Sequence, residues 1–163
     1  METRRLWLLG GIFVLAIGLA FPAIVMAGPD STATVSFGTL DTGSPFPRGH
    51  DSSFNGRENL VPRTVVISEG GSVTFEIDGF HQVAVYKAGT TPDDITVPAF
   101  PPNLFINDPN GRVALGPLNA APPATTSWTT PAGTFSTPGR YLVLCNVTPH
   151  FAVAKMYGWV EVK

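Results

Sequence analysis

FSTPGRYLVLCNVTPHFAVAKMYGWVEV, which runs from Phe135 to Val162, is the most informative part of the sequence for the architecture of the chain. It contains two apolar runs, Tyr141–Leu144 and Tyr157–Val162, and each has the length and composition of a β-strand. Cys145, the only cysteine of the chain, directly follows the first run. The stretch therefore predicts a hairpin in which a thiol lies where the first strand meets the connecting loop.

Three side chains of this loop carry atoms that bind soft or borderline metals. They are the thiol of Cys145, the imidazole of His150 and the thioether of Met156, which lie within a dozen residues. Each alone is more often structural, because a buried cysteine packs, a methionine fills a core gap and a loop histidine is solvated. Together they favour a metal site, and they suit copper better than calcium or magnesium, which prefer oxygen.

A fourth group is expected from His81. It follows the alternating strand Val73–Ile77 and a short turn, and it opens a second alternating run, His81–Tyr86. His81, Val83 and Val85 would share the apolar face of that strand. A histidine that begins such a face can point into the end of a barrel, toward the lone cysteine.

Three segments resemble the cupredoxins, the small blue copper proteins. They are Ile67–Phe75, Gly79–His81 and Phe135–Tyr141 leading into Cys145, and the similarity extends from about Arg63 to the end of the chain. The resemblance implies an all-β, Greek-key sandwich or barrel that holds one type 1 copper ion.

The resemblance also implies roles for the candidate ligands. The residues matching His81, Cys145 and His150 form a trigonal set in the family, and the residue matching Met156 is a long axial ligand. Five residues, Phe151–Lys155, separate His150 from Met156 here, more than related proteins usually have. A larger bulge could return Met156 to the metal, or leave a weak or missing axial bond. In the family, the positions of Gln82 and Asn146 help to tie the two ligand-bearing loops together.

Composition supports an all-β chain. Its 163 residues suit one domain, glycine (17) and proline (16) are abundant, and only 13% of residues are charged. We expect three parts: residues 1–27 as signal peptide or membrane anchor, residues 28–61 as an irregular segment with a short strand at Ala33–Phe37, and residues 62–163 as the copper-binding domain.

The N-terminus predicts export. Arg4 and Arg5 precede an apolar stretch at residues 6–27, as in signal peptides, and Thr3–Leu8 partly resembles a twin-arginine signal. The stretch is also long enough to anchor the chain if it is not cleaved. We expect a periplasmic or other extracytoplasmic location, where a single free thiol would be a liability unless a metal held it.

Charge excludes one class of partner. The formal net charge is −2 and no basic patch is evident in the sequence, so nucleic acid is not an expected partner. We expect a monomer that contacts other proteins only transiently.

The remaining segments carry local predictions. A turn at Glu69–Gly71 should join the strands Arg63–Ser68 and Ser72–Ile77. Ser127–Thr129 should form a short strand, and His50 should be a solvated loop residue outside the site. The long connection at residues 87–123 should dock onto the barrel through its apolar residues, and its aspartates should serve turns rather than bind calcium. Those apolar residues are Phe100, Leu104, Phe105 and Ile106, and the aspartates are Asp93, Asp94 and Asp108.

These predictions lead to a hypothesis about function. A site with two imidazoles, a thiolate and a thioether suits one-electron transfer between Cu(I) and Cu(II), with His150 as the electron port for transient redox partners. The chain would then be a carrier and not an enzyme. One alternative is a copper carrier or store that does not shuttle electrons, and another is a metal-free interaction module.

Overall fold

The computed structural model describes residues 30–38, 60–120 and 125–163. The predictions for residues 1–27 and for His50 fall outside these residues. Within them, none of the helices has the length and apolar character needed to cross a membrane. The strands are β1 (Asp30–Gly38), β2 (Leu60–Val61), β3 (Thr64–Asp78), β4 (His81–Ala88), β5 (Arg112–Asn119), β6 (Thr125–Thr129), β7 (Gly139–Cys145) and β8 (Tyr157–Val162), with a 3-10 turn η1 (Pro92–Asp94) and one short helix α1 (Thr148–Ala152).

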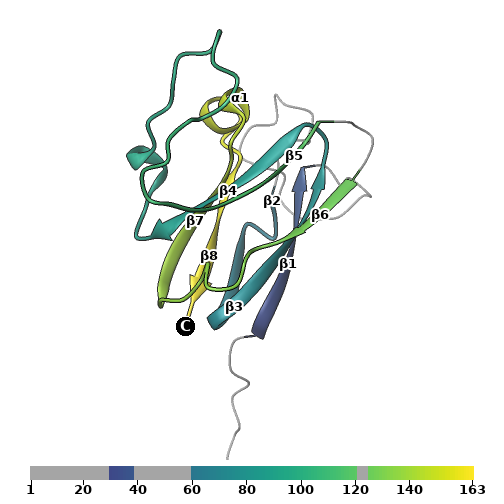
Figure 1. Ribbon diagram of the computed structural model, residues 1–163, viewed down its shortest axis with the longest axis vertical. Helices are drawn as coiled ribbons and strands as arrows, with labels where there is room; N and C mark the ends of the chain where they lie inside the picture. Colours follow the sequence, from purple (N-terminus) through teal and green to yellow (C-terminus); the bar gives the residue numbers. More distant parts are fainter. Residues whose placement is uncertain (1–29, 39–59, 121–124) are drawn as a thin grey trace, which may run out of the picture.

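The strands form one sheet that curls into two facing halves (Figure 1). The first half of β3 pairs with β8 in parallel, and the order continues through β7 and β4 to β5. The second half of β3 pairs with β1 in parallel and with β6 antiparallel. β3 therefore belongs to both halves and links them.

The predicted turn at Glu69–Gly71 is wrong, because β3 is one continuous strand through these residues. Gly70 has a φ of +76°, which bends the strand without reversing it. The Gly70 N–H donates to the carbonyl of Phe135, and the Glu69 N–H to that of Lys163. The strand continues because its two halves find different partners, and Val65, Ile67 and Val73 all remain in the core.

The main core lies between the two halves. It contains Phe37 of β1, Phe75 and Ile77 of β3, Val83 of β4 and Val143 of β7, all fully or almost fully buried. Burial of apolar side chains of this size contributes about 1.5–3 kcal/mol each. The alternating burial of β3 matches the period of two that the sequence shows, whereas β4 is buried on both faces from Val83 to Tyr86.

A second, smaller core covers the outer face of β4, β7 and β8. Ala84, Tyr86, Leu142 and Leu144 point away from the main core, and Phe151 of α1 packs on them. The connection between β4 and β5 closes this layer with two buried isoleucines, Ile95 and Ile106. Both faces of β4 and β7 are therefore buried, which accounts for the unbroken apolar run Tyr141–Leu144.

Docking of the long connection is confirmed only in part. Ile106 is fully buried and the ring of Phe105 lies 6.4 Å from that of Phe80. Phe100 and Leu104 instead remain 52% and 40% exposed. The predicted role of the aspartates in turns is confirmed for two of them. The Asp94 carboxylate accepts from the N–H and hydroxyl of Thr91, and that of Asp108 from the N–H groups of Thr96 and Asn110.

Candidate metal centre

The hairpin predicted from the stretch Phe135–Val162 is present. β7 and β8 pair antiparallel, with Leu144 opposite Tyr157, so Cys145 is the last residue of its strand. The loop between them forms α1, which the sequence did not predict. Pro149 lies in the first turn of α1, where a backbone N–H has no partner within the helix, so the missing N–H of proline costs no hydrogen bond. His150 is therefore held on a helical turn rather than on an extended loop.

His81 reaches the same point from the neighbouring strand. It is the first residue of β4, and Val83 of β4 pairs with Cys145 of β7. The antiparallel pairing places the start of one strand beside the end of the other. Two side chains that are 64 positions apart in the sequence thus meet at one end of the sandwich.

The three donor atoms form a compact triangle. Cys145 Sγ lies 3.6 Å from His81 Nδ1 and 3.7 Å from His150 Nδ1, and the two Nδ1 atoms are 3.0 Å apart. Geometry puts a point roughly 2 Å from all three atoms, close to the bonds of about 2.0 to 2.3 Å that zinc makes to imidazole nitrogen and thiolate sulfur. The triangle is therefore of the right size for one transition-metal ion.

Burial differs among the candidate ligands. Cys145 and Met156 are buried in the main core, and His81 is only 2% exposed. His150 is half-buried, so of these four side chains it alone reaches solvent appreciably. The site is thus closed on the protein side and open only at one imidazole.

β1 packs closely against His81. The ring of Phe37 meets that of His81 edge-on at 6.0 Å. Gly38 follows with a φ of +105°, and a Cβ at Gly38 would collide with the carbonyl oxygen of Asp78 and lie 2.9 Å from Cδ2 of His81. Only glycine fits at this position, because any side chain would collide with the backbone of Asp78 and crowd the His81 ring.

The longer His150–Met156 segment is taken up by α1. The N–H groups of Val153 and Ala154 both donate to the carbonyl of Pro149, which closes the helical turn. Lys155 then adopts a φ of +56°, and the Met156 N–H donates to the carbonyl of His150 at 3.0 Å. The backbone of Met156 is therefore brought back beside His150 despite the five intervening residues.

A side-chain hydrogen bond ties the two ligand-bearing segments together. Asn146 Nδ2 donates to Gln82 Oε1 at 2.8 Å, and the Asn146 backbone N–H donates to the Gln82 carbonyl at 2.7 Å. Gln82 Nε2 in turn donates to the carbonyl of Gly116 on β5. The residues that follow His81 and Cys145 thus lock the two ligands in register. Asn146-Val147-Thr148 has the pattern of a glycosylation sequon, but Asn146 is buried and leaves no room for a glycan.

The connection between β4 and β5 gives further support that sequence reasoning missed. The Thr148 N–H donates to the carbonyl of Leu104, and the Ile106 N–H to that of Asn146. Phe105 and Val147 form an isolated antiparallel bridge. These backbone contacts brace the loop that carries His150. In the sequence, the apolar cluster Leu104–Ile106 indicated that this segment packs on the domain, but not which loop it contacts.

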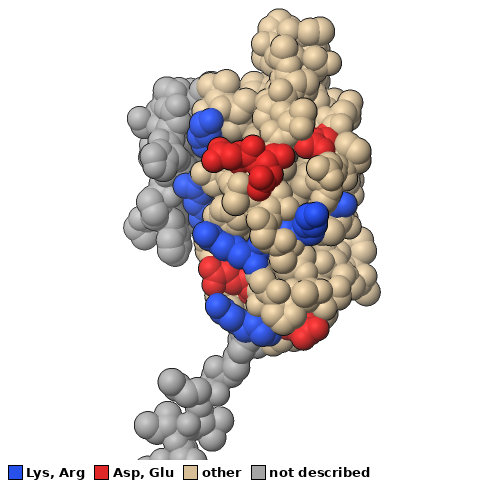
Figure 2. Space-filling model, turned by 90° about the vertical axis from the view of Figure 1, so that its left-hand side faces the viewer, with Lys and Arg blue, Asp and Glu red and all other residues tan. Residues whose placement is uncertain are grey.

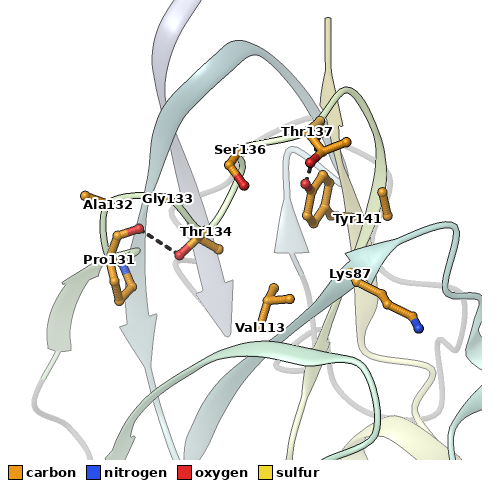
Figure 3. Close-up of a pocket in the computed structure, with 10 residues that line it drawn as sticks. Lys87, Val113, Pro131, Ala132, Gly133, Thr134, Ser136, Thr137 and Tyr141 are labelled. Carbon is orange, nitrogen blue, oxygen red and sulfur yellow. Dashed lines mark hydrogen bonds between the residues drawn. The ribbon is translucent and has the colours of Figure 1, made fainter.

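A cavity of about 500 Å³ lies at the other ends of the same strands (Figure 3). It is lined by Lys87 near the end of β4 and Tyr141 near the start of β7, whereas His81 and Cys145 lie at the opposite ends. Thr134 and Tyr141 donate their hydroxyl hydrogens to carbonyls at its wall. This cavity is separate from the donor triangle.

Comparison with known proteins identifies the fold. No protein-family model matches the chain, and no curated protein sequence does. The dithionite-reduced auracyanin of Roseiflexus castenholzii superposes with a TM-score of 0.52 at 20% identity, over 83% of this chain and 99% of that chain. Reduced rusticyanin superposes with a TM-score of 0.47 at 22% identity, over 85% and 82%. A mutant fern plastocyanin has a TM-score of 0.42 at 23% identity, over 80% and 99%. The similarity to auracyanin shows that the chain has the cupredoxin fold, as the sequence predicted.

Proposed function

We propose that the protein is an extracytoplasmic blue copper protein that carries single electrons between redox partners. The observation that carries this proposal is the triangle of one sulfur and two nitrogen atoms, with sides of 3.0, 3.6 and 3.7 Å, built into the end of a cupredoxin fold. Copper bound there would supply the one-electron couple Cu(I)/Cu(II). Auracyanin A of Chloroflexus aurantiacus, whose structure is also similar, is a blue copper protein.

The chain's own residues would hold the ion in a fixed environment. Thiolate and thioether donors favour Cu(I), and imidazoles also suit Cu(II). His81, Cys145 and His150 would form the trigonal set, with Met156 as the weak axial donor. The bond between Gln82 and Asn146 would keep the donors from moving when the charge changes, which supports fast exchange.

His150 would be the port through which electrons pass at this end of the molecule. It is the candidate ligand that reaches solvent. Two exposed apolar side chains lie close to it: Val153, three residues further along the chain, and Leu104, on the connection between β4 and β5. Val153 closes α1 and is 53% exposed, and the carbonyl of Leu104 accepts from Thr148 at the start of the helix. An apolar patch of this kind suits brief contacts with partner proteins.

Voltammetry of the copper-loaded protein on an electrode tests the proposal. We expect a reversible one-electron wave that persists over repeated cycles without loss of metal. A copper carrier or store would instead release its ion on reduction or oxidation. An irreversible wave with copper appearing in the buffer would overturn electron carriage and favour that alternative.

A further inference from the structure

The outer side of β8 carries a strip of basic and aromatic side chains. Along β8, residues with odd numbers point away from the main core, so Tyr157 and Trp159 lie on the outer face. Figure 2 views the molecule from the side on which β7 and β8 lie in Figure 1. Several basic groups, in blue, form a column down the left of this view, next to the grey atoms. The β8 strip comprises Arg63, Arg140, Lys155, Tyr157, Trp159 and Lys163.

Contacts join these residues into one continuous surface. The guanidinium of Arg63 lies 4.7 Å from the ring centre of Tyr157, and that of Arg140 lies 3.9 Å from that of Trp159. The rings of Tyr157 and Trp159 are 6.2 Å apart. Arg63 also donates to the backbone carbonyls of Tyr157 and Lys155, which brings Lys155 into the strip.

The strip is basic because the fold gathers residues that are scattered in the sequence, where no basic patch was evident. It holds four of the six Lys and Arg residues in the part of the chain that the structure describes. Within it, Glu161 pairs with Arg140 at 3.8 Å and with Lys163 at 3.4 Å. Both cations are more than half exposed, and such surface pairs leave them available to an outside anion.

The aromatic residues of the β8 strip remain partly accessible to solvent. Tyr157 and Trp159 pack on the second core and are half-buried. Tyrosine, tryptophan and arginine are the residues enriched in the energetic centres of protein interfaces. Aromatic rings with arginine guanidinium groups stacked over them therefore have the composition of a protein-binding site.

The strip also connects directly to the candidate metal centre. The Cys145 N–H donates to the Met156 carbonyl at 3.0 Å, and that carbonyl carbon is bonded to the nitrogen of Tyr157. One hydrogen bond and one peptide bond thus link the thiol residue to the first aromatic residue of the strip. This gives a lateral route to the surface that does not pass through His150.

We propose that the β8 strip is a second docking surface, at which an acidic electron-transfer protein exchanges electrons with the metal centre. This inference rests on the proposed function for its redox step, and on charge complementarity for its partner. The exposed aspartates of the connection, Asp93 and Asp94, would repel an acidic partner that approached there instead of at the strip.

Binding is tested with hexacyanochromate(III), a paramagnetic and redox-inert trianion, added to the 15N-labelled protein without copper. We expect line broadening centred on the amides of Tyr157 and Trp159 and on the Trp159 indole. Arg140→Gln should weaken the broadening, and Lys87→Gln, which removes one positive charge near the cavity of Figure 3, should not. Broadening centred on α1, or equal loss in both variants, would overturn the inference.

Electron transfer is tested with hexacyanoferrate(III), which takes one electron from the Cu(I) protein and becomes hexacyanoferrate(II) as the copper becomes Cu(II). At low ionic strength Arg140→Gln should lower the second-order rate constant about threefold or more, and added salt should remove the difference. Lys87→Gln should have a smaller effect, and equal effects would contradict lateral docking.

The two experiments separate the two proposals. The broadening map needs no metal, so it remains readable if the protein carries no electrons. Rapid oxidation without localised broadening would overturn the second docking surface alone. Cosedimentation with phosphatidylglycerol vesicles that Arg140→Gln abolishes would assign the strip to a membrane surface and overturn the protein partner.

Discussion

Asn146 donates its side-chain amide to Gln82 Oε1 at 2.8 Å, and this bond joins the residue after Cys145 to the residue after His81. Two ligand-bearing strands are thereby fixed to each other within one residue of their candidate ligands. The bond is partly buried, so its loss would leave a polar oxygen of Gln82 without its partner.

Replacing Asn146 by alanine should lower the free energy of unfolding by about 1–3 kcal/mol, because it leaves that oxygen unpaired. Urea denaturation of the copper-free protein measures the change. Asn103→Ala is a matched control, since its side-chain amide is exposed and donates to the carbonyl of Ala99. That variant should stay within about 0.5 kcal/mol of the wild type. Equal changes in the free energy of unfolding of the two variants would show that the Asn146–Gln82 hydrogen bond does not stabilise the fold more than an exposed one.

Substitution of Met156 tests its role as axial ligand. Met156→Leu should keep the visible colour of the Cu(II) protein and raise the reduction potential, because a weak donor is lost. Met156→Gln should lower the potential, because an amide oxygen stabilises Cu(II). Voltammetry of the two variants measures both shifts. Potentials unchanged in both would show that Met156 packs in the core without bonding the metal.

A charge placed beside His150 should slow electron exchange between two copies of the protein. Val153→Asp puts like charges face to face when the His150 ends meet, so the self-exchange rate from NMR line widths should fall about tenfold at low salt. Val113→Asp is the matched control, because Val113 is also an exposed valine (44%) but lines the distant cavity. A similar fall in both variants would argue against His150 as the port.

Acid should weaken the connection that braces the site. Hydrogen bonds from the Thr96 and Asn110 N–H groups hold the pKa of Asp108 below its usual value. A carboxyl with a lower pKa in the folded state contributes stability above its unfolded pKa of about 3.9, and this is lost as pH falls through the folded pKa.

Asp108→Asn should therefore cost about 1 kcal/mol in free energy of unfolding at pH 7 and progressively less below pH 4. Urea denaturation of wild type and variant between pH 2 and pH 7 measures the difference. A difference that stays constant over this range would show that the charge of Asp108 is not what the two N–H groups stabilise.

The sequence predicted the site better than the path of the chain around it. Cys145 and His81 could be placed because each marks the end of an apolar strand, and strand ends meet at the edge of a sheet. The Gly70–Gly71 pair has the composition of a turn, yet the flanking halves of β3 bind different partners. That choice depends on β1 and β8, which the local signal does not contain.

Two further features required the fold to be known. α1 has only five residues, which is too short for a helical period to show, and it absorbs the longer spacing before Met156. The second core depends on the connection from β4 to β5 covering Tyr86 and Leu142, a contact between distant segments. Tyr157 and Trp159 of the β8 strip pack on this second core and stay half-buried.

Copper binding by His81, Cys145 and His150 is best tested by adding Cu(II) to the purified protein and recording visible and EPR spectra. We predict one bound copper per chain, an intense visible thiolate-to-Cu(II) band with the narrow copper hyperfine splitting of a type 1 site, and loss of that band in Cys145→Ser. A protein that stays colourless, or a Cys145→Ser variant as strongly coloured as the wild type, would contradict the copper site.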